Sequence, residues 1–470
     1  MTRLLGLAPA IALLLAACLP GPSSSHSLPG STSASAQVSG QVSTDAIRAH
    51  LEALQAIADA NGGVRTAGTA GYEASVQYVA EQLRDLGYAV ETPEFEMATF
   101  TEEPGATIQV SGGPAFAGGR DFRAMIYSGG GEITAPVAAV GFGSDERGGC
   151  DASDFTAFPA GAIALTPPGP CFRRQAVLNA IEAGATALVV SFPQRPAGHV
   201  LRPTLLEPDG IAIPALAASG AVGDALKAAA EAGDAVRISV RTEVGRAMVH
   251  NVIAESGAVA DRVVMLGGHL DSVHDGPGIN DNGSGNAALL EVARLLVEEH
   301  PGERVRLAFW GGEELGLFGS RAYVESLDPD ERAEIHAYLN LDMLGSLNPV
   351  PTVYASPDAA RGSRAITDFL VQYLEEAGIG AERSDIGASS DHAPFDDAGI
   401  PTGGIFSGAN ELKTAAQSAD FGGTSDAPMD ACYHLACDTV ENVNLENVTL
   451  FAEAAAAVAL ALTTGRLSVP

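Results

Sequence analysis

Histidine and acidic residues in the second half of the chain follow apolar segments at positions where they could bind a metal. His269 and Asp271 come directly after the apolar run 262–266, and Asp281 follows in the same glycine-rich stretch, before the helical pattern 287–297. Open α/β sheets bind ligands at such turns between a strand and a helix. Imidazole and carboxylate groups without a cysteine are typical ligands of zinc, with manganese or cobalt as alternatives. The stretch therefore predicts a metal site, although a glycine- and aspartate-rich turn with one buried histidine is the simpler alternative.

Two adjacent glutamates, Glu313 and Glu314, follow the next apolar run, 304–310. If the chain stays extended here, the two side chains point in opposite directions. One glutamate could then bind a metal while the other faces the water that attacks the substrate. On its own, a pair of glutamates is more often a solvated turn.

Two further positions complete the set of candidate residues. Asp342 ends an apolar run, where it could bind a metal or cap the following turn. Tyr433 and His434 lie between Cys432 and Cys437. A disulfide between these cysteines would close a very short loop and hold both side chains in place, as a preorganised site requires.

In this order, the candidate residues strongly resemble those of the di-zinc aminopeptidases of the bacterial leucyl aminopeptidase type. The resemblance covers roughly residues 43–100 and 245–465, with close runs at HLDSV, GINDNGSG, GGEELGLFGS, SDHAPF and CYH. It implies two zinc ions per chain, both bound by one shared carboxylate. The implied ligands are the bridging Asp281, His269 and Asp342 in one site, and Glu314 and His434 in the other.

The resemblance also implies roles for three residues beside the metals. Glu313 would be the general base that takes a proton from the attacking water and passes it to the leaving amine. Tyr433 would donate a hydrogen bond to the oxyanion of the tetrahedral intermediate. Asp271 would orient the imidazole of the first histidine ligand. A cis peptide bond is expected between Asp281 and Asn282.

Two other histidines are assigned no metal. His392 lies in the family-like run SDHAPF and is expected to have a structural role, whereas His274 is expected to be exposed. Some relatives carry an arginine where this chain has Ser389. An additional cation for the substrate carbonyl is therefore absent at that position.

The spacing of apolar segments predicts an α/β fold. From about residue 245, apolar runs of strand length alternate with helical patterns. This alternation favours a mostly parallel central sheet covered by helices on both faces, a three-layer sandwich. The stretch 101–244 has short strands broken by turn residues and resembles the small β-rich protease-associated domain. A generic α/β insertion is the alternative.

The N-terminal segment is typical of an exported protein. Arg3 precedes an apolar stretch that is too short to span a bilayer, and Leu15-Ala-Ala-Cys18 resembles the lipobox of bacterial lipoproteins. An ordinary cleaved signal is the alternative. The expected domains are a signal peptide at 1–18, a flexible linker at 19–42, a di-zinc peptidase domain at 43–100 and 245–465, and a protease-associated insert at 101–244.

Charge and cysteine content narrow the choice of partners and compartment. The formal net charge of −32 argues against nucleic acid and anionic membrane surfaces as partners. Membrane attachment is expected only through a lipid at Cys18, in the bacterial cell envelope, unless the protein is secreted. Export permits disulfides, and the four remaining cysteines favour the local pairs Cys150–Cys171 and Cys432–Cys437, although four cysteines allow three connectivities.

Together, these features predict an exported di-zinc metallo-aminopeptidase that hydrolyses the N-terminal peptide bond of peptides with a free N-terminus. A di-zinc carboxypeptidase, or another amidohydrolase on the same scaffold, is the first alternative. It would need a basic group placed for a terminal carboxylate, and none can be located from the sequence. An inactive binding module is the second alternative, but all five ligand positions and the base are present.

Overall fold

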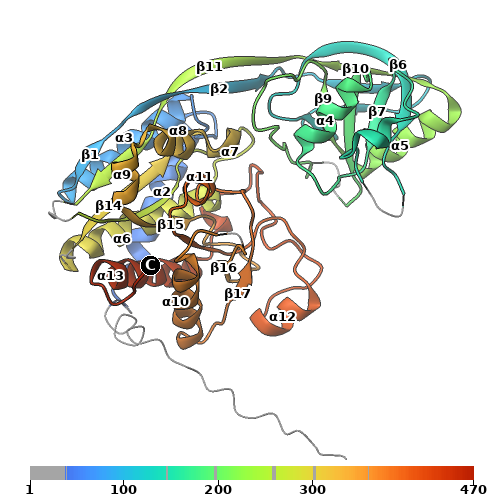
Figure 1. Cartoon of the computed structure of the whole chain (residues 1–470). Coiled ribbons are helices and arrows are strands. Elements are labelled where there is room, and N and C mark those ends of the chain that lie inside the picture. Colours follow the sequence, from blue (N-terminus) through green and yellow to red (C-terminus); the bar gives the residue numbers. More distant parts are fainter. Residues whose placement is uncertain are drawn as a thin grey trace, which may run out of the picture.

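Two eight-stranded sheets organise the chain, one at each end of a long two-stranded ribbon (Figure 1). The computed structural model describes residues 38, 40–143, 147–194, 198–256, 261–299, 303–357 and 359–469. The expected signal peptide and most of the expected linker lie outside these residues. The ribbon pairs β2 (Glu94–Glu102) with β11 (Thr242–His250) in antiparallel register.

The first sheet contains the segments predicted to bind metal. In spatial order its strands are β1 (Ala89–Glu91), β12 (Val252–Glu255), β14 (Arg304–Trp310), β13 (Val263–His269), β15 (Ile335–Leu341), β18 (Thr402–Phe406), β16 (Thr352–Tyr354) and β17 (Glu382–Ser384). The central strands β14, β13, β15 and β18 run parallel. Their carboxyl ends therefore meet at one edge, where open α/β sheets bind ligands.

Helices cover both faces of this sheet. One face packs against α2 (Thr44–Ala60), α3 (Ala70–Asp85), α6 (Gly285–Glu299), α10 (Ser363–Glu376) and α13 (Leu445–Thr463), and the other against α8 (Phe318–Ser326) and α11 (Ala393–Asp397). Side chains alternate across β13, because Val264 and Leu266 pack with the first group of helices whereas Met265 packs with Phe395 of α11. The predicted three-layer sandwich is confirmed.

The remaining helices are short. They are α7 (Glu313–Gly316), α9 (Pro329–Glu334), α12 (Ala415–Phe421), the 3-10 helices η1 (Ala152–Phe155) and η3 (Val440–Asn442), and the π-helical turn η2 (Ile279–Ser284). Both α7 and η2 begin after a glycine with positive φ, Gly312 and Gly278. The turn at Gly312 leads from β14 directly into Glu313 and Glu314, and the turn at Gly278 begins the segment that contains Asp281.

The packed part of the chain begins before the first long helix. Ser43 caps α2 by accepting a hydrogen bond from the backbone N–H of Ala46 at 3.1 Å. Val38 and Val42 are buried. Apolar packing therefore starts within the last residues of the stretch that was expected to be a flexible linker.

Helix α13 is long and apolar enough to cross a membrane by length and composition, with a mean hydropathy of 1.5. However, 72% of this stretch is buried inside the molecule, and the helix packs against α2, α6 and α10. Its apolar character is that of a core helix, which is buried on all sides.

The insert forms the second sheet. In spatial order its strands are β4 (Ala115–Ala117), β3 (Thr107–Val110), β10 (Ala235–Val240), β6 (Gly131–Ala139), β7 (Ile163–Thr166), β8 (Ala187–Phe192), β9 (Ala215–Ser219) and β5 (Phe122–Ala124). Two helices, α4 (Arg173–Glu182) and α5 (Gly220–Ala232), follow β7 and β9. The predicted disulfide Cys150–Cys171 is present.

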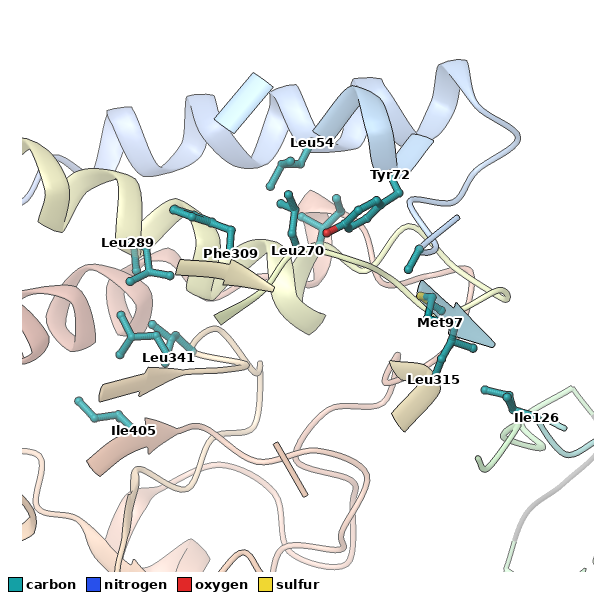
Figure 2. Packing of buried hydrophobic residues seen from close by; sticks show 14 of the residues in the cluster. Leu54, Tyr72, Met97, Ile126, Leu270, Leu289, Phe309, Leu315, Leu341 and Ile405 are labelled. Carbon is teal, nitrogen blue, oxygen red and sulfur yellow. The ribbon is translucent and has the colours of Figure 1, made fainter. Parts of the chain in front are cut away.

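Apolar packing is continuous from the first sheet to the insert (Figure 2). The buried side chains that form this continuous packing are labelled in the figure, in order from the first sheet to the insert, as Ile405, Leu341, Leu289, Phe309, Leu270, Leu54, Tyr72, Met97, Leu315 and Ile126. Met97 belongs to ribbon strand β2, and Ile126 belongs to the insert. The insert is therefore attached by a shared core as well as by its two connecting strands.

Candidate active site

Three of the predicted metal ligands follow neighbouring parallel strands. His269 ends β13, Glu314 comes shortly after β14, and Asp342 comes directly after β15. Asp281 lies in η2, and His434 lies in the loop between α12 and η3. The carboxyl edge of the sheet brings together residues that lie far apart in the sequence.

Asp281 lies between the two histidines and faces each with a different oxygen. Its Oδ1 is 3.1 Å from His269 Nε2, and its Oδ2 is 3.1 Å from His434 Nε2. On the first side, His269 Nε2 is also 3.4 Å from Asp342 Oδ1. On the second side, His434 Nε2 is 3.0 Å from Glu314 Oε2. The five side chains therefore form two groups that share one carboxylate.

The donor set fits a metal ion. Ligand atoms of His269, Asp281 and Glu314, all buried, lie within 4.8 Å of one another. Glu314 Oε1 and Asp342 Oδ1 are buried and have no hydrogen-bond partner among the described residues. Buried carboxylate oxygens without a partner are costly unless a cation or a donor satisfies them. Imidazole nitrogen and carboxylate oxygen are preferred donors for zinc.

Strong electrostatic coupling joins these groups. Burial by itself would lower the pKa of both histidines, but the carboxylates outweigh it, so the pKa of His269 lies well above its ordinary value and that of His434 rises to about 10. Burial raises the pKa of Glu314 to about 7 against the opposing effect of His434. For Asp281, hydrogen bonds from the histidines outweigh burial and lower the pKa. A bound metal ion would replace the protons that the histidines hold.

Asp271 contacts both His269 and the segment that follows β14. His269 Nδ1 lies 3.1 Å from the backbone oxygen of Asp271 and 3.7 Å from its carboxylate Oδ1. The same Oδ1 accepts a hydrogen bond from the backbone N–H of Glu313 at 3.2 Å. The shorter contact to the imidazole is thus made by the backbone of Asp271, while its carboxylate fixes the start of α7.

The expectation of an extended backbone at Glu313 and Glu314 is wrong. Strand β14 ends at Trp310, and the chain turns at Gly312 so that both glutamates begin α7. Their side chains nevertheless have different surroundings, because Glu314 is buried beside His434 whereas Glu313 is half-buried and lines the cavity described below. Burial raises the pKa of Glu313 well above its ordinary value, and neighbouring carboxylates add to this effect.

Tyr433 and His434 lie in a short disulfide-closed loop. The predicted Cys432–Cys437 bond is present, and His434 adopts a positive φ of 57°. The Tyr433 ring stacks on the His434 imidazole, with 3.8 Å between ring centroids. The disulfide and the stacking both restrict the two side chains that this loop presents to the site.

A buried polar network beneath Asp281 was not predicted. Asp438 accepts hydrogen bonds from the backbone N–H groups of Asn280 at 2.8 Å and Asp281 at 3.0 Å. Asn442 donates to both Asp438 and Asp430, and Asp430 also accepts from Asn280 Nδ2 at 2.6 Å. The expected cis peptide bond between Asp281 and Asn282 is present in the segment that this network holds. Asp438 directly follows Cys437, but no local pattern indicates that its carboxylate points inward.

Arg65 is a second buried residue whose position only the structure reveals. Its guanidinium donates hydrogen bonds to the carbonyl oxygens of Leu270, Pro277 and Gly278, and its side chain is fully buried. These carbonyls lie at both ends of the loop between His269 and η2. Arg65 therefore fixes the loop that separates two of the predicted ligands.

Two remaining predictions concern neighbouring side chains. His392 is buried against Tyr354, with 4.8 Å between ring centroids, in agreement with a structural role. In the same SDHAPF run, Ser390 Oγ donates to Asp342 Oδ2 at 2.7 Å and orients that carboxylate. The expectation that His274 is exposed is wrong. It is half-buried against Phe100, and burial lowers its pKa to about 4.

A cavity of about 570 Å³ opens beside the predicted ligands. His269, Asp281, Glu313, Glu314, Asp342, Tyr433 and His434 all line it. Its other walls include the apolar side chains of Ile386, Phe406, Leu412 and Met429. We call it the apolar cavity. Together with the sheet and the paired acidic and imidazole groups, this cavity is typical of an α/β metallohydrolase.

Comparison with known proteins identifies the family. The description "Peptidase family M28" matches residues 251–459, and "PA domain" matches residues 133–226. The chain is 39% identical over 466 residues to a probable lipoprotein aminopeptidase, LpqL, of Mycobacterium tuberculosis, covering 94% of this chain and 90% of that protein. It is 38% identical over 427 residues to an aminopeptidase of Pseudomonas aeruginosa, covering 86% of this chain and 78% of that protein.

The solved structure of the aminopeptidase from Aneurinibacillus sp. strain AM-1 has a similar fold, with a TM-score of 0.73, 25% sequence identity, and coverage of 93% of this chain and 98% of that one. The chain belongs to peptidase family M28, with a protease-associated insert. The predicted family is confirmed. The prediction of an aminopeptidase is confirmed as well.

Proposed function

We propose that this aminopeptidase holds two zinc ions through Asp281, His269, Asp342, Glu314 and His434, and cleaves the N-terminal amide bond of peptides. The observation that carries the proposal is the position of Asp281, whose two oxygens each lie 3.1 Å from a different histidine Nε2. A carboxylate between two imidazoles is the geometry that a bridging ligand requires. When bound, the metal ions would supply Lewis-acid activation of the scissile carbonyl and of a water.

The side chains of the site divide the proton transfers between them. Glu313 would accept a proton from the attacking water and deliver it to the leaving amine, because it is half-buried on the cavity wall and, in this proposal, binds no metal. The Tyr433 hydroxyl would donate a hydrogen bond to the carbonyl oxygen as negative charge develops there. Burial raises the pKa of Tyr433 well above its ordinary value, so the hydroxyl keeps its proton for this task.

The apolar cavity would hold the side chain of the N-terminal residue. Ile386, Phe406, Leu412 and Met429 give it an apolar wall, while Glu313 and Asp342 present carboxylates to the free α-amine. An apolar first residue such as leucine fits this surface, because burying an aliphatic side chain stabilises the complex by roughly 1.5–3 kcal/mol.

The different tasks of Glu313 and Glu314 provide the test. Glu313→Gln should keep both zinc ions and lower kcat on leucyl amides by roughly 10²–10⁴-fold, since glutamine cannot accept the proton. Glu314→Gln removes a charged ligand that lies 3.0 Å from His434. It should lose one zinc ion at low zinc concentration and regain part of its activity when zinc is added. Metal content by mass spectrometry and steady-state rates distinguish the two defects.

Glu325→Gln is the matched control, because this exposed glutamate lies on the neighbouring helix α8 and outside the cavity. It should leave both zinc content and rate unchanged. If Glu313→Gln loses zinc while Glu314→Gln keeps it, the two roles are reversed. If the parent binds two zinc ions and hydrolyses no aminoacyl or peptidyl amide, the proposed reaction is wrong.

We also propose that the protein is a cell-envelope lipoprotein anchored through Cys18. The support is the run Leu15-Ala-Ala-Cys18 and the similarity to a protein described as a probable lipoprotein aminopeptidase. A single acyl chain holds a protein only weakly at a membrane, and the diacylglycerol of bacterial lipoproteins supplies the second chain that stable anchoring needs.

A further inference from the structure

A second cavity, of about 530 Å³, lies between the insert and the metal-binding edge of the first sheet. We call it the interdomain cavity. Its walls on the two sides include Glu313, Glu314 and Tyr433 of the active site and Phe172, Arg173 and Leu206 of the insert. Glu313, Glu314, Tyr433 and His434 line the apolar cavity too. The two cavities therefore meet at the predicted zinc ligands and the predicted base.

The insert is held firmly against the loops that carry these residues. Thr204 Oγ1 donates to the backbone oxygen of Leu315 in α7 at 3.3 Å. Arg202 donates to Asp275, in the loop after His269, at 2.9 Å. A Cβ added to Gly316 would lie 2.5 Å from the backbone oxygen of Leu206, so the backbones of α7 and the insert are in close contact. The insert wall of the interdomain cavity is thus fixed relative to the active site.

Arg173 is the residue of the insert that adds a positive charge without an ion-pair partner to this wall. It opens helix α4, whose first turn contains no acidic residue and no side-chain cap. The neighbouring cations are paired, Arg174 with Glu207 and Arg202 with Asp275 and Glu102. Within the described part of the chain, Arg173 forms no ion pair.

The position of Arg173 near the active site has further support. The Cys150–Cys171 disulfide ends two residues before it and restricts the segment. Arg173 is exposed to solvent and lines the interdomain cavity together with Tyr433. The cation therefore shares a cavity with a residue that is proposed to contact the scissile carbonyl.

The arrangement of the two cavities suggests how a peptide would lie. If the N-terminal side chain occupies the apolar cavity, the part of the peptide beyond the scissile bond leaves through the interdomain cavity. With a formal net charge of −32, the protein as a whole repels anionic peptides. A single unpaired guanidinium on the exit path would offset this repulsion locally and form charge-assisted hydrogen bonds to a carboxylate.

We infer that the interdomain cavity binds the leaving-group part of the peptide and that Arg173 recognises a carboxylate there. The inference rests on the proposed cleavage of N-terminal amide bonds. The carboxylate can be the C-terminus of a di- or tripeptide or the side chain of an acidic residue after the scissile bond. Arg173 is thus a specificity-determining residue contributed by the insert, and short peptides with a free C-terminus are a preferred substrate class.

Matched peptide substrates test the inference. Leu-Ala and Leu-Ala-Ala are compared with their C-terminal amides, and Leu-Asp-NH2 with Leu-Asn-NH2. In the parent, at least one carboxylate-bearing peptide should exceed its neutral match by about tenfold in kcat/KM, mainly through KM, as expected for a charge-assisted hydrogen bond. The pair that shows the difference identifies the source of the carboxylate. Arg173→Ala should abolish the difference, Arg173→Lys should retain most of it, and Arg173→Glu should reverse it.

Leucinamide, which has no carboxylate, provides the internal reference. Its hydrolysis and the zinc content should be the same in the parent, in Arg173→Ala and in the control Arg237→Ala, since Arg237 is exposed on β10 and pairs with Glu132. The inference is overturned if the parent does not distinguish any carboxylate peptide from its neutral match, or if Arg173→Ala slows all substrates equally. Failure of the parent on leucinamide, or hydrolysis of N-acetyl-Leu-Ala as a carboxypeptidase would perform it, overturns the proposed function instead.

Discussion

Replacing Asp438 with alanine should destabilise the segment that carries the bridging aspartate. Asp438 is buried and accepts hydrogen bonds from the backbone N–H groups of Asn280 and Asp281, at 2.8 and 3.0 Å. The substitution leaves both donors buried without an acceptor. Each such donor costs about 1–3 kcal/mol, so the free energy of unfolding should fall by roughly 2–6 kcal/mol.

The pH of the measurement matters, because burial raises the pKa of Asp438 to about 7. A carboxyl group with a raised pKa stabilises the fold most at low pH and loses that contribution as the pH rises from its unfolded value toward 7. The difference between parent and Asp438→Ala should therefore be larger at pH 6 than at pH 8. Zinc affinity should also fall by about 10–100-fold, as is usual when a residue that supports a ligand is removed.

The chain contains a single tryptophan, which makes the assay specific. Trp310 is fully buried in β14 and donates a hydrogen bond to Tyr338. Its fluorescence during urea unfolding of the metal-free protein therefore reports the lobe that contains the site. Asp420→Ala is the control, because Asp420 is exposed on α12. If Asp438→Ala unfolds within about 0.5 kcal/mol of the parent, the range of ordinary surface substitutions, and retains zinc against a chelator, the network does not support the loop.

Two further predictions concern pH and the N-terminus. The folded state holds His274 neutral, with a pKa lowered to about 4, mainly by burial and also by Arg202. The stabilisation that neutral His274 contributes should be complete above the unfolded pKa of about 6.5. It should be lost as the pH falls to 4, which lowers the free energy of unfolding by on the order of 2–3 kcal/mol. His274→Asn should flatten this pH dependence in urea unfolding, and equal slopes in both proteins would contradict the assignment. Protein from its native host should begin at Cys18 and carry diacylglycerol by intact-mass spectrometry, whereas an unmodified start beyond Cys18 would exclude the anchor.

The sequence by itself determined the class of fold and the set of metal-site candidates. Apolar runs of strand length end just before His269, Glu313 and Asp342. Parallel strands place their carboxyl ends at one edge, which favours a meeting of these residues, but the complete ligand set, with Asp281 and His434, followed only from the resemblance to the di-zinc aminopeptidases. Four cysteines allow three pairings, and the sequence favoured the two local pairs, which are the ones present.

Only the tertiary structure decided how the candidate residues are supported and what surrounds them. Arg65 is hydrogen-bonded to carbonyls more than two hundred residues away, and Asp438 holds a backbone segment that belongs to a different loop. A buried charge leaves no periodic pattern, since its partners are set by the packing of distant segments. For the same reason no sequence pattern singled out Arg173 of the insert, which the fold places in the wall of the interdomain cavity with Tyr433.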